Sequence, residues 1–220
     1  MQNRKLSKNN SLMDIAGDKN RKKILTSVLV VIVVLLSAAP VVLIGIILFG
    51  SVTSKPEVYN DISHYRKYMS FAPESMWHKW GMDETIWPQE IIDNMAVSDF
   101  KMVYYDPWDA QYLGYLVIDY SEDDYIEEAE RLRAYKSTDY IGYYGVVEEK
   151  TYDLLAVNAD PYNGFVYALT DGKSKIIYAE EIFCNYYMDL DYWDYISEEY
   201  LLDGFDARID NPYRKTMMNE

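Results

Sequence analysis

The hydrophobic and polar positions divide this chain into an apolar segment near its N-terminus and a longer region of mixed pattern after it. From Ile24 to Ser54 there are 31 consecutive residues without a charged side chain, and 19 of the residues in 24–50 are Val, Leu, Ile or Phe. A helix of roughly 20 apolar residues crosses a bilayer core of about 30 Å. The pattern therefore predicts a single transmembrane helix from Ile24 to Gly50, kinked at Pro40 and in contact with the lipid bilayer.

A cleaved signal peptide is the alternative interpretation of this segment. Residues 24–36 have the length of its apolar region, and Ser37-Ala38-Ala39 has the small side chains found before a cleavage site. However, Pro40 would then begin the mature chain, where it would distort the backbone that a peptidase binds. The apolar stretch 41–49 would also be left exposed, so the sequence favours an uncleaved anchor.

Charge predicts how the anchor is oriented. Residues 1–23 contain seven basic and two acidic side chains, and basic flanks of a transmembrane helix stay in the cytoplasm. We therefore expect a disordered, cytoplasmic N-terminal tail and an extracytoplasmic C-terminus. The region 55–220 contains 14 basic and 34 acidic residues, so it would repel nucleic acid, which we exclude as a partner.

The pattern after the anchor changes from irregular to strand-like. A helix is expected over about 55–70, followed by an irregular segment with a short helix near Pro88. Alternating positions and the turn residues Asp-Pro and Asp-Gly then predict strands joined by hairpins. The predicted strands are 99–105, 111–120, 140–148, 152–158, 165–170 and 175–183, and the predicted helices are 121–136 and 197–202.

This element order predicts an α+β fold: one N-terminal transmembrane helix, then a mostly antiparallel sheet with helices on one face. The expected divisions are a cytoplasmic tail (1–23), the transmembrane helix (24–50), a membrane-proximal helix with an irregular aromatic segment (51–96), an extracytoplasmic domain (97–205) and a flexible tail (206–220).

Aromatic residues are concentrated beyond the anchor, where all 23 tyrosines and all five tryptophans lie. Adjacent tyrosines, such as Tyr104-Tyr105, Tyr143-Tyr144 and Tyr186-Tyr187, would point to opposite faces of a strand. The sequence offers four tryptophans as binding candidates, because such rings stack on sugars or fill a groove in a partner. They are Trp77, Trp80, Trp87 and Trp108. Filling the open side of the sheet is the alternative role for these rings.

Candidate catalytic and metal-binding chemistry is weak. The layout of the chain resembles that of the sortases, but Glu181-Ile182-Phe183-Cys184 lacks their Thr-Leu-x-Thr pattern before the cysteine, and strand alternation predicts a buried, inert Cys184. Neither a zinc spacing nor a calcium loop is present, so no metal and no cofactor is expected. The 34 acidic residues always offer some pair of carboxylates for hydrolysis, and their number alone identifies no catalytic site.

These features together predict a non-enzymatic membrane protein with an acidic, tyrosine-rich outer domain that binds a protein or a component of the cell envelope, such as a cell-wall glycan. The alternative is an envelope hydrolase or transferase that uses carboxylates without a recognisable motif. With one cysteine and no Asn-x-Ser/Thr site beyond the anchor, the outer domain lacks the disulfides and glycans usual in animal or plant ectodomains. This favours a bacterial cell membrane.

Overall fold

The computed structural model describes residues 2–79, 81–92, 95–138, 151–183, 188–202, 207–208 and 215. The chain divides into two compact units, Met1–Thr53 and Ser54–Glu220. Several predicted features lie outside the described residues: the strand 140–148, the burial of Cys184, the paired tyrosines other than Tyr104-Tyr105, the position of Trp80 and most of the flexible tail 206–220.

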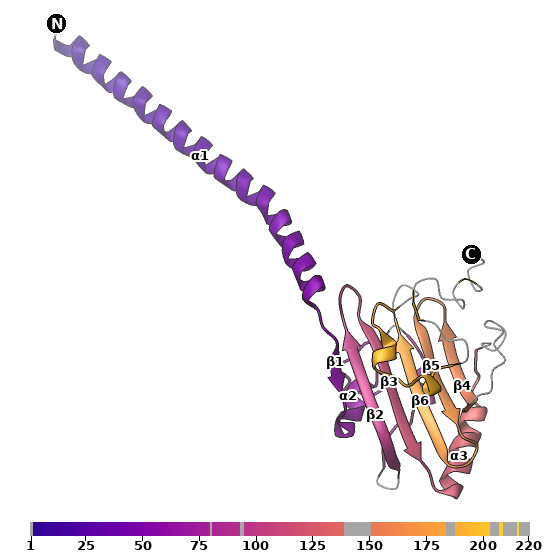
Figure 1. Cartoon of the computed structure of the whole chain (residues 1–220). Coiled ribbons are helices and arrows are strands. Elements are labelled where there is room, and N and C mark those ends of the chain that lie inside the picture. The colour runs from indigo at the N-terminus through magenta and orange to yellow at the C-terminus, as the bar shows by residue number, and fades with distance from the viewer. Residues whose placement is uncertain are drawn as a thin grey trace. The chain divides into compact units, whose positions relative to one another are not determined.

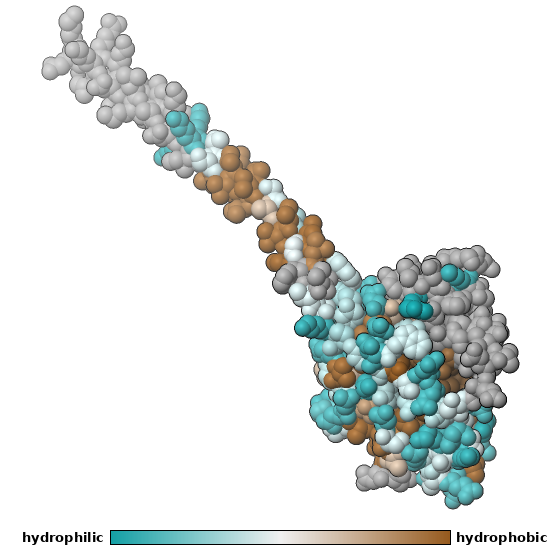
Figure 2. Space-filling model, in the orientation of Figure 1, coloured by the Kyte–Doolittle hydropathy of each residue, from teal (hydrophilic) through white to brown (hydrophobic). Residues whose placement is uncertain are grey.

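The first unit is one helix, α1 (Gln2–Thr53), which contains Pro40. Within it, Arg21–Leu48 is long and apolar enough to cross a membrane by length and composition. Figure 2 shows the apolar side chains of this part as a brown stretch. The backbone is helical through residues 2–23 as well, where the sequence predicts disorder. A helix that is already nucleated extends at little cost, because each added residue gains a hydrogen bond.

The second unit is built on a six-stranded sheet with the strand order β1-β2-β3-β6-β5-β4 (Figure 1). All five pairs of neighbouring strands are antiparallel, which confirms an α+β fold with an antiparallel sheet. The strands are β1 (Glu57–Tyr59), β2 (Ala96–Tyr105), β3 (Gln111–Asp119), β4 (Asp153–Asp160), β5 (Gly164–Thr170) and β6 (Lys175–Ile182).

Local signals in the sequence predict several of these elements correctly. The helix α3 (Glu122–Arg133) begins after Ser121, whose hydroxyl accepts a hydrogen bond from the backbone N–H of Asp124. Gly172 has a φ of 73° in the turn between β5 and β6, as an Asp-Gly hairpin requires. The expected helix at 197–202 is reduced to one 3-10 turn, η4 (Glu198–Tyr200).

The prediction of a helix over 55–70 is wrong for its first part. Residues 57–59 form the edge strand β1. Val58 pairs with Val103 of β2, so β1 supplies hydrogen-bond partners to backbone groups at the edge of β2. Helical structure follows only as η1 (Ile62–His64) and the single turn α2 (Tyr65–Tyr68). The short helix expected near Pro88 is also absent from described residues 88–92, and a 3-10 turn, η2 (Glu84–Ile86), precedes them.

Both faces of the sheet are covered. One face packs against α3, α2 and η2, and its core includes Leu116, Ile118 and Leu132. The opposite face packs against the C-terminal segment, which contains η3 (Tyr192–Asp194) and η4. The expectation of helices on one face holds for α2 and α3, whereas 3-10 turns cover the other face. Tyr104 and Tyr105 pack on opposite faces, which confirms the alternation predicted for this doublet.

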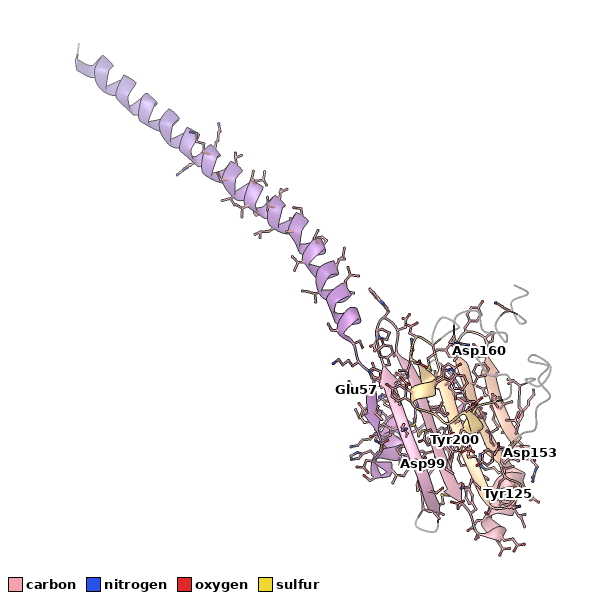
Figure 3. All side chains as sticks on the ribbon, in the orientation of Figure 1. Glu57, Asp99, Tyr125, Asp153, Asp160 and Tyr200 are labelled. Carbon is pink, nitrogen blue, oxygen red and sulfur yellow. The ribbon has the colours of Figure 1, made fainter. Side chains whose placement is uncertain are left out.

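The strand register fixes which turns share an end of the sheet. One row runs across all six strands through Glu57, Tyr104, Tyr112, Ile182, Gly164 and Asp160. The β2–β3 and β4–β5 turns therefore lie at one end, which we call the β2–β3 end, and α3 begins at the opposite end, the α3 end. In Figure 3, Glu57 and Asp160 lie toward the β2–β3 end, and Tyr125 and Asp153 lie toward the α3 end.

Candidate functional site

The tryptophans suggested as binding residues do not share one surface. Trp77 and Trp87 are buried, with 5% and 0% of their surface exposed, whereas Trp108 is 59% exposed. Trp80 lies outside the described residues. The burial of Trp77 and Trp87 favours their alternative role, filling the space over the sheet, and leaves Trp108 as the accessible candidate of the three.

Trp77 lies at the centre of an aromatic cluster on the α3-covered face. Its ring centroid is 4.9 to 6.0 Å from the centroids of four tyrosine rings, Tyr59, Tyr68, Tyr104 and Tyr112. Such contacts each add roughly 0.5–1.5 kcal/mol beyond the burial of apolar area. In this part of the domain, the high aromatic content therefore contributes to the stability of the core.

A buried ionic cluster lies next to these rings. The Lys79 ammonium Nζ is 2.5 Å from a carboxylate oxygen of Glu84 and 2.5 Å from one of Glu180. None of these side chains is more than 1% exposed. Both the N–H and the hydroxyl of Ser70 donate to the second oxygen of Glu84, while the second oxygen of Glu180 lacks a hydrogen-bond partner among the described residues.

The pKa values of the three groups in this cluster shift in different directions. Burial raises the pKa of Glu180 well above its usual value, and the nearby Lys79 charge offsets this only in part. Burial also acts to raise the pKa of Glu84, but Lys79 and the hydrogen bonds to Glu84 outweigh it and lower that pKa. Burial acts to lower the pKa of Lys79, but the two carboxylates outweigh it and raise that pKa. The consistent state is a charged Lys79, an ionised Glu84 and a protonated Glu180 hydrogen-bonded to Glu84.

The neighbouring residue, Glu181, is buried on the opposite face of β6. Burial raises its pKa well above the usual value. Its oxygen lies 2.9 Å from the hydroxyl of Tyr167, and that hydroxyl is 2.8 Å from the carbonyl oxygen of Tyr200. A hydroxyl has one hydrogen to donate. The Glu181 oxygen and the Tyr200 carbonyl oxygen share this hydrogen of Tyr167, and the bond to Glu181 acts to lower the pKa of Glu181, although burial outweighs it.

Reasoning from the sequence did not single out Glu180 or Glu181. A usable signal was present, because an acidic doublet interrupts the apolar strand Ile176-Ile177-Tyr178-Ala179 before Ile182. Charged residues are almost never fully buried unless they are paired or neutral. Both carboxyls are completely buried, so a substrate in solution does not reach them in this structure.

The described domain does contain a surface pocket, at the α3 end. It has a volume of about 310 Å³ and lies between α3 and the segment leading into β2. Its walls combine apolar, aromatic and charged side chains: Ile92, Met95, Tyr120, Asp124, Glu127, Glu128 and Arg131. With three carboxylates and one guanidinium, this α3 pocket has a net negative charge, and Ile92 and Met95 give it apolar surface.

The α3 pocket is held in shape by hydrogen bonds that continue into the core. Arg131 pairs with both oxygens of Glu128, each at 2.7 Å, and also donates to the carbonyl oxygens of Thr85 and Ile86. The hydroxyl of Tyr178 donates to Glu128 at 2.5 Å and lies 2.7 Å from that of Tyr120. These bonds occupy Arg131 and Glu128.

A second surface depression lies around η1 and α2, on the same face of the sheet as α3. It has a volume of about 500 Å³ and is lined in part by His64, Arg66, Glu74 and Glu90. Arg66 forms ion pairs with both glutamates, so the opposite charges in this depression largely cancel. The α3 pocket, with its unbalanced charge, is therefore the better candidate for binding a ligand of definite charge.

Metal binding finds no support in the part of the chain that the structure describes, where no group of three or more His, Cys, Asp or Glu side chains is placed to hold an ion. Comparisons of the chain with protein-family models, with curated proteins and with solved structures gave no match.

Proposed function

We propose that this protein is anchored in the cytoplasmic membrane of a bacterium by α1 and presents its acidic second unit outside the cell as a binding module. The observation that carries the anchor is the exposure of α1. Every large apolar side chain from Leu25 to Leu48 is at least 45% exposed. An apolar surface of this length is unfavourable in water, and a lipid bilayer covers it. The basic residues before it support a cytoplasmic N-terminus.

The α3 pocket supports a partner with a positively charged group. Asp124 and Glu127 lie in the pocket together with the Arg131–Glu128 pair. A lysine or arginine side chain of a protein, or an amine of an envelope component, would place its charge near these carboxylates and its carbon chain against Ile92 and Met95. The accessible Trp108 is at the opposite end of the sheet, so it contributes nothing to this pocket.

A hydrolase or transferase is less well supported as the function. The carboxyls with the most strongly raised pKa are those of Glu180 and Glu181, and neither is accessible. In the α3 pocket, both oxygens of Glu128 accept hydrogen bonds from Arg131, so this carboxylate is already engaged within the protein.

Photocrosslinking in intact cells tests the binding role. A photoreactive amino acid replaces Ile92 inside the pocket or Ile126 on the outer surface of α3, and the two native residues are equally exposed at 49%. We expect a discrete crosslinked product from position 92 and none from position 126. The added substitution Glu127→Lys should remove the product, because it reverses a charge at the pocket. Equal crosslinking from both positions, or insensitivity to Glu127→Lys, would contradict a role for the pocket.

The anchor is tested separately. The full-length protein should stay with membranes in alkaline carbonate, and added protease should digest the second unit in intact cells. Release by carbonate, or complete protection of the second unit, would show that the proposed topology is wrong.

A further inference from the structure

The first residues of the second unit lie at the β2–β3 end of the sheet. The hydroxyl of Ser54 donates to the carbonyl oxygen of Asp106 in the β2–β3 turn, at 2.8 Å. Glu57, at the start of β1, pairs with Tyr104 near the end of β2. The chain therefore enters the domain directly beside this turn.

Two turns of similar sequence lie at this end. Asp106-Pro107-Trp108-Asp109 joins β2 to β3, and Asp160-Pro161-Tyr162-Asn163 joins β4 to β5. Trp108 is 59% exposed and Tyr162 is 43% exposed. The turns are separated by about three strand spacings, or roughly 14 Å. Two amphipathic aromatic side chains thus reach the surface at the same end of the sheet.

Chain length limits how far this end lies from the apolar part of α1. From Gly50 to Ser54 there are four residue steps, which cover at most about 14 Å when fully extended. Ser54, which is hydrogen-bonded to the β2–β3 turn, is therefore no more than about 14 Å from Gly50, the last residue of the predicted transmembrane segment. Trp and Tyr are the residues that favour the headgroup level of a membrane, because their rings are apolar and their N–H or O–H groups are polar.

We propose that the β2–β3 end is a membrane-contact surface, with Trp108 as its principal anchor in the headgroup layer and Tyr162 beside it. This inference rests on the proposed insertion of α1. The preferred lipid has an uncharged, zwitterionic headgroup, because Asp106, Asp109 and Asp160 border the aromatic rings and would be repelled by anionic lipid. The α3 pocket lies at the opposite end of the sheet from this surface.

Quenching of tryptophan fluorescence in vesicles tests this surface. Full-length protein is reconstituted into phosphatidylcholine brominated near the headgroup end of its acyl chains. The chain has no tryptophan before residue 77, so α1 contributes no tryptophan signal. We expect bromolipid to quench part of the emission of the unmodified protein, and Trp108→Phe to remove most of this quenchable part. The double variant Trp108→Phe with Ile126→Trp moves an exposed tryptophan to the α3 end and should not restore the quenching.

The outcomes separate the two proposals. The same vesicles are washed in alkaline carbonate before measurement. If the protein washes off, the anchor is wrong and the membrane-contact surface falls with it. If the protein is retained but Trp108→Phe is quenched as strongly as the unmodified protein, or the relocated tryptophan restores quenching, then the contact surface alone is refuted and the anchor stands.

Discussion

Single residues in this protein show how burial decides the ionisation of a carboxyl. Glu180 and Glu181 are neighbours on β6 and are both completely buried, on opposite faces. Glu180 lies beside a lysine that also pairs with Glu84, whereas Glu181 accepts a hydrogen bond from the neutral hydroxyl of Tyr167. Burial thus raises the pKa of both carboxyls and favours their protonated forms, because a buried negative charge without its own partner is costly.

Glu181→Gln tests this protonation. Because the pKa of Glu181 is raised in the folded state, its contribution to stability is fully present below the unfolded pKa of about 4.3 and is lost as the pH rises through the folded pKa. An amide keeps an oxygen that can accept the hydrogen bond from Tyr167, and it does not ionise. Relative to the unmodified protein, the variant should gain up to about 1.4 kcal/mol of unfolding free energy per pH unit above pH 5.

Urea unfolding between pH 4 and pH 8 measures this gain, and Glu199→Gln, at an exposed carboxylate, is the control that should show little pH-dependent difference. A constant difference across the pH range for Glu181→Gln would mean that Glu181 is ionised when folded.

At the scale of elements, close approach between strands restricts which residue can occupy a turn. Gly164, the first residue of β5, has a φ of 117°, and a Cβ there would lie 2.0 Å from the carbonyl oxygen of Glu181. Gly172, in the next turn, has a φ of 73° but no atom within 4 Å of where a Cβ would be. Both positions require the backbone freedom of glycine, and only Gly164 also requires the absence of a side chain.

Paired substitutions at these glycines separate the two requirements. Gly172→Ala should cost about 1–2 kcal/mol from the positive φ alone. Gly164→Ala should cost at least about 3 kcal/mol, because the backbone of β6 must also move. Thermal or urea unfolding measures both values, and equal losses would show that the β5–β6 contact is loose enough to admit a methyl group.

Elements were predictable from the sequence where the signal was local. Ser121 identifies the start of α3, and Asp171-Gly172 identifies the β5–β6 turn, because capping and turn formation involve only near neighbours in the chain. The strand at 57–59 was not predictable. These three residues also fit a helical pattern, and they form a strand because they pair with β2, which lies more than 40 residues later in the chain. A tertiary contact overrides local preference in such a short segment.

On the scale of the whole molecule, the second unit contains what it needs to fold without α1. It has a core on each face of the sheet, and its first strand begins at Glu57, after the unit boundary at Thr53. A domain of this size buries enough surface to be stable alone. We expect residues 54–220 to be soluble and to unfold cooperatively.

Far-ultraviolet and near-ultraviolet circular dichroism, recorded during urea unfolding of residues 54–220, test this expectation. The two signals should change over the same range of urea concentration. Non-coincident transitions, or strong binding of a hydrophobic dye before unfolding, would show that α1 contributes to the fold of the second unit.

The sequence by itself determined the apolar helix, the antiparallel α+β architecture, the acidity of the second unit and the alternation of Tyr104 and Tyr105. These follow from composition and from periodicities of two or 3.6 residues, which are visible in a linear chain. Only the tertiary structure decided that Trp77 and Trp87 are buried, that burial raises the pKa of Glu180 and Glu181, and that a negatively charged pocket forms beside α3. Burial and charge balance depend on residues such as Lys79, which lies 101 positions from Glu180 in the chain and 2.5 Å from it in space.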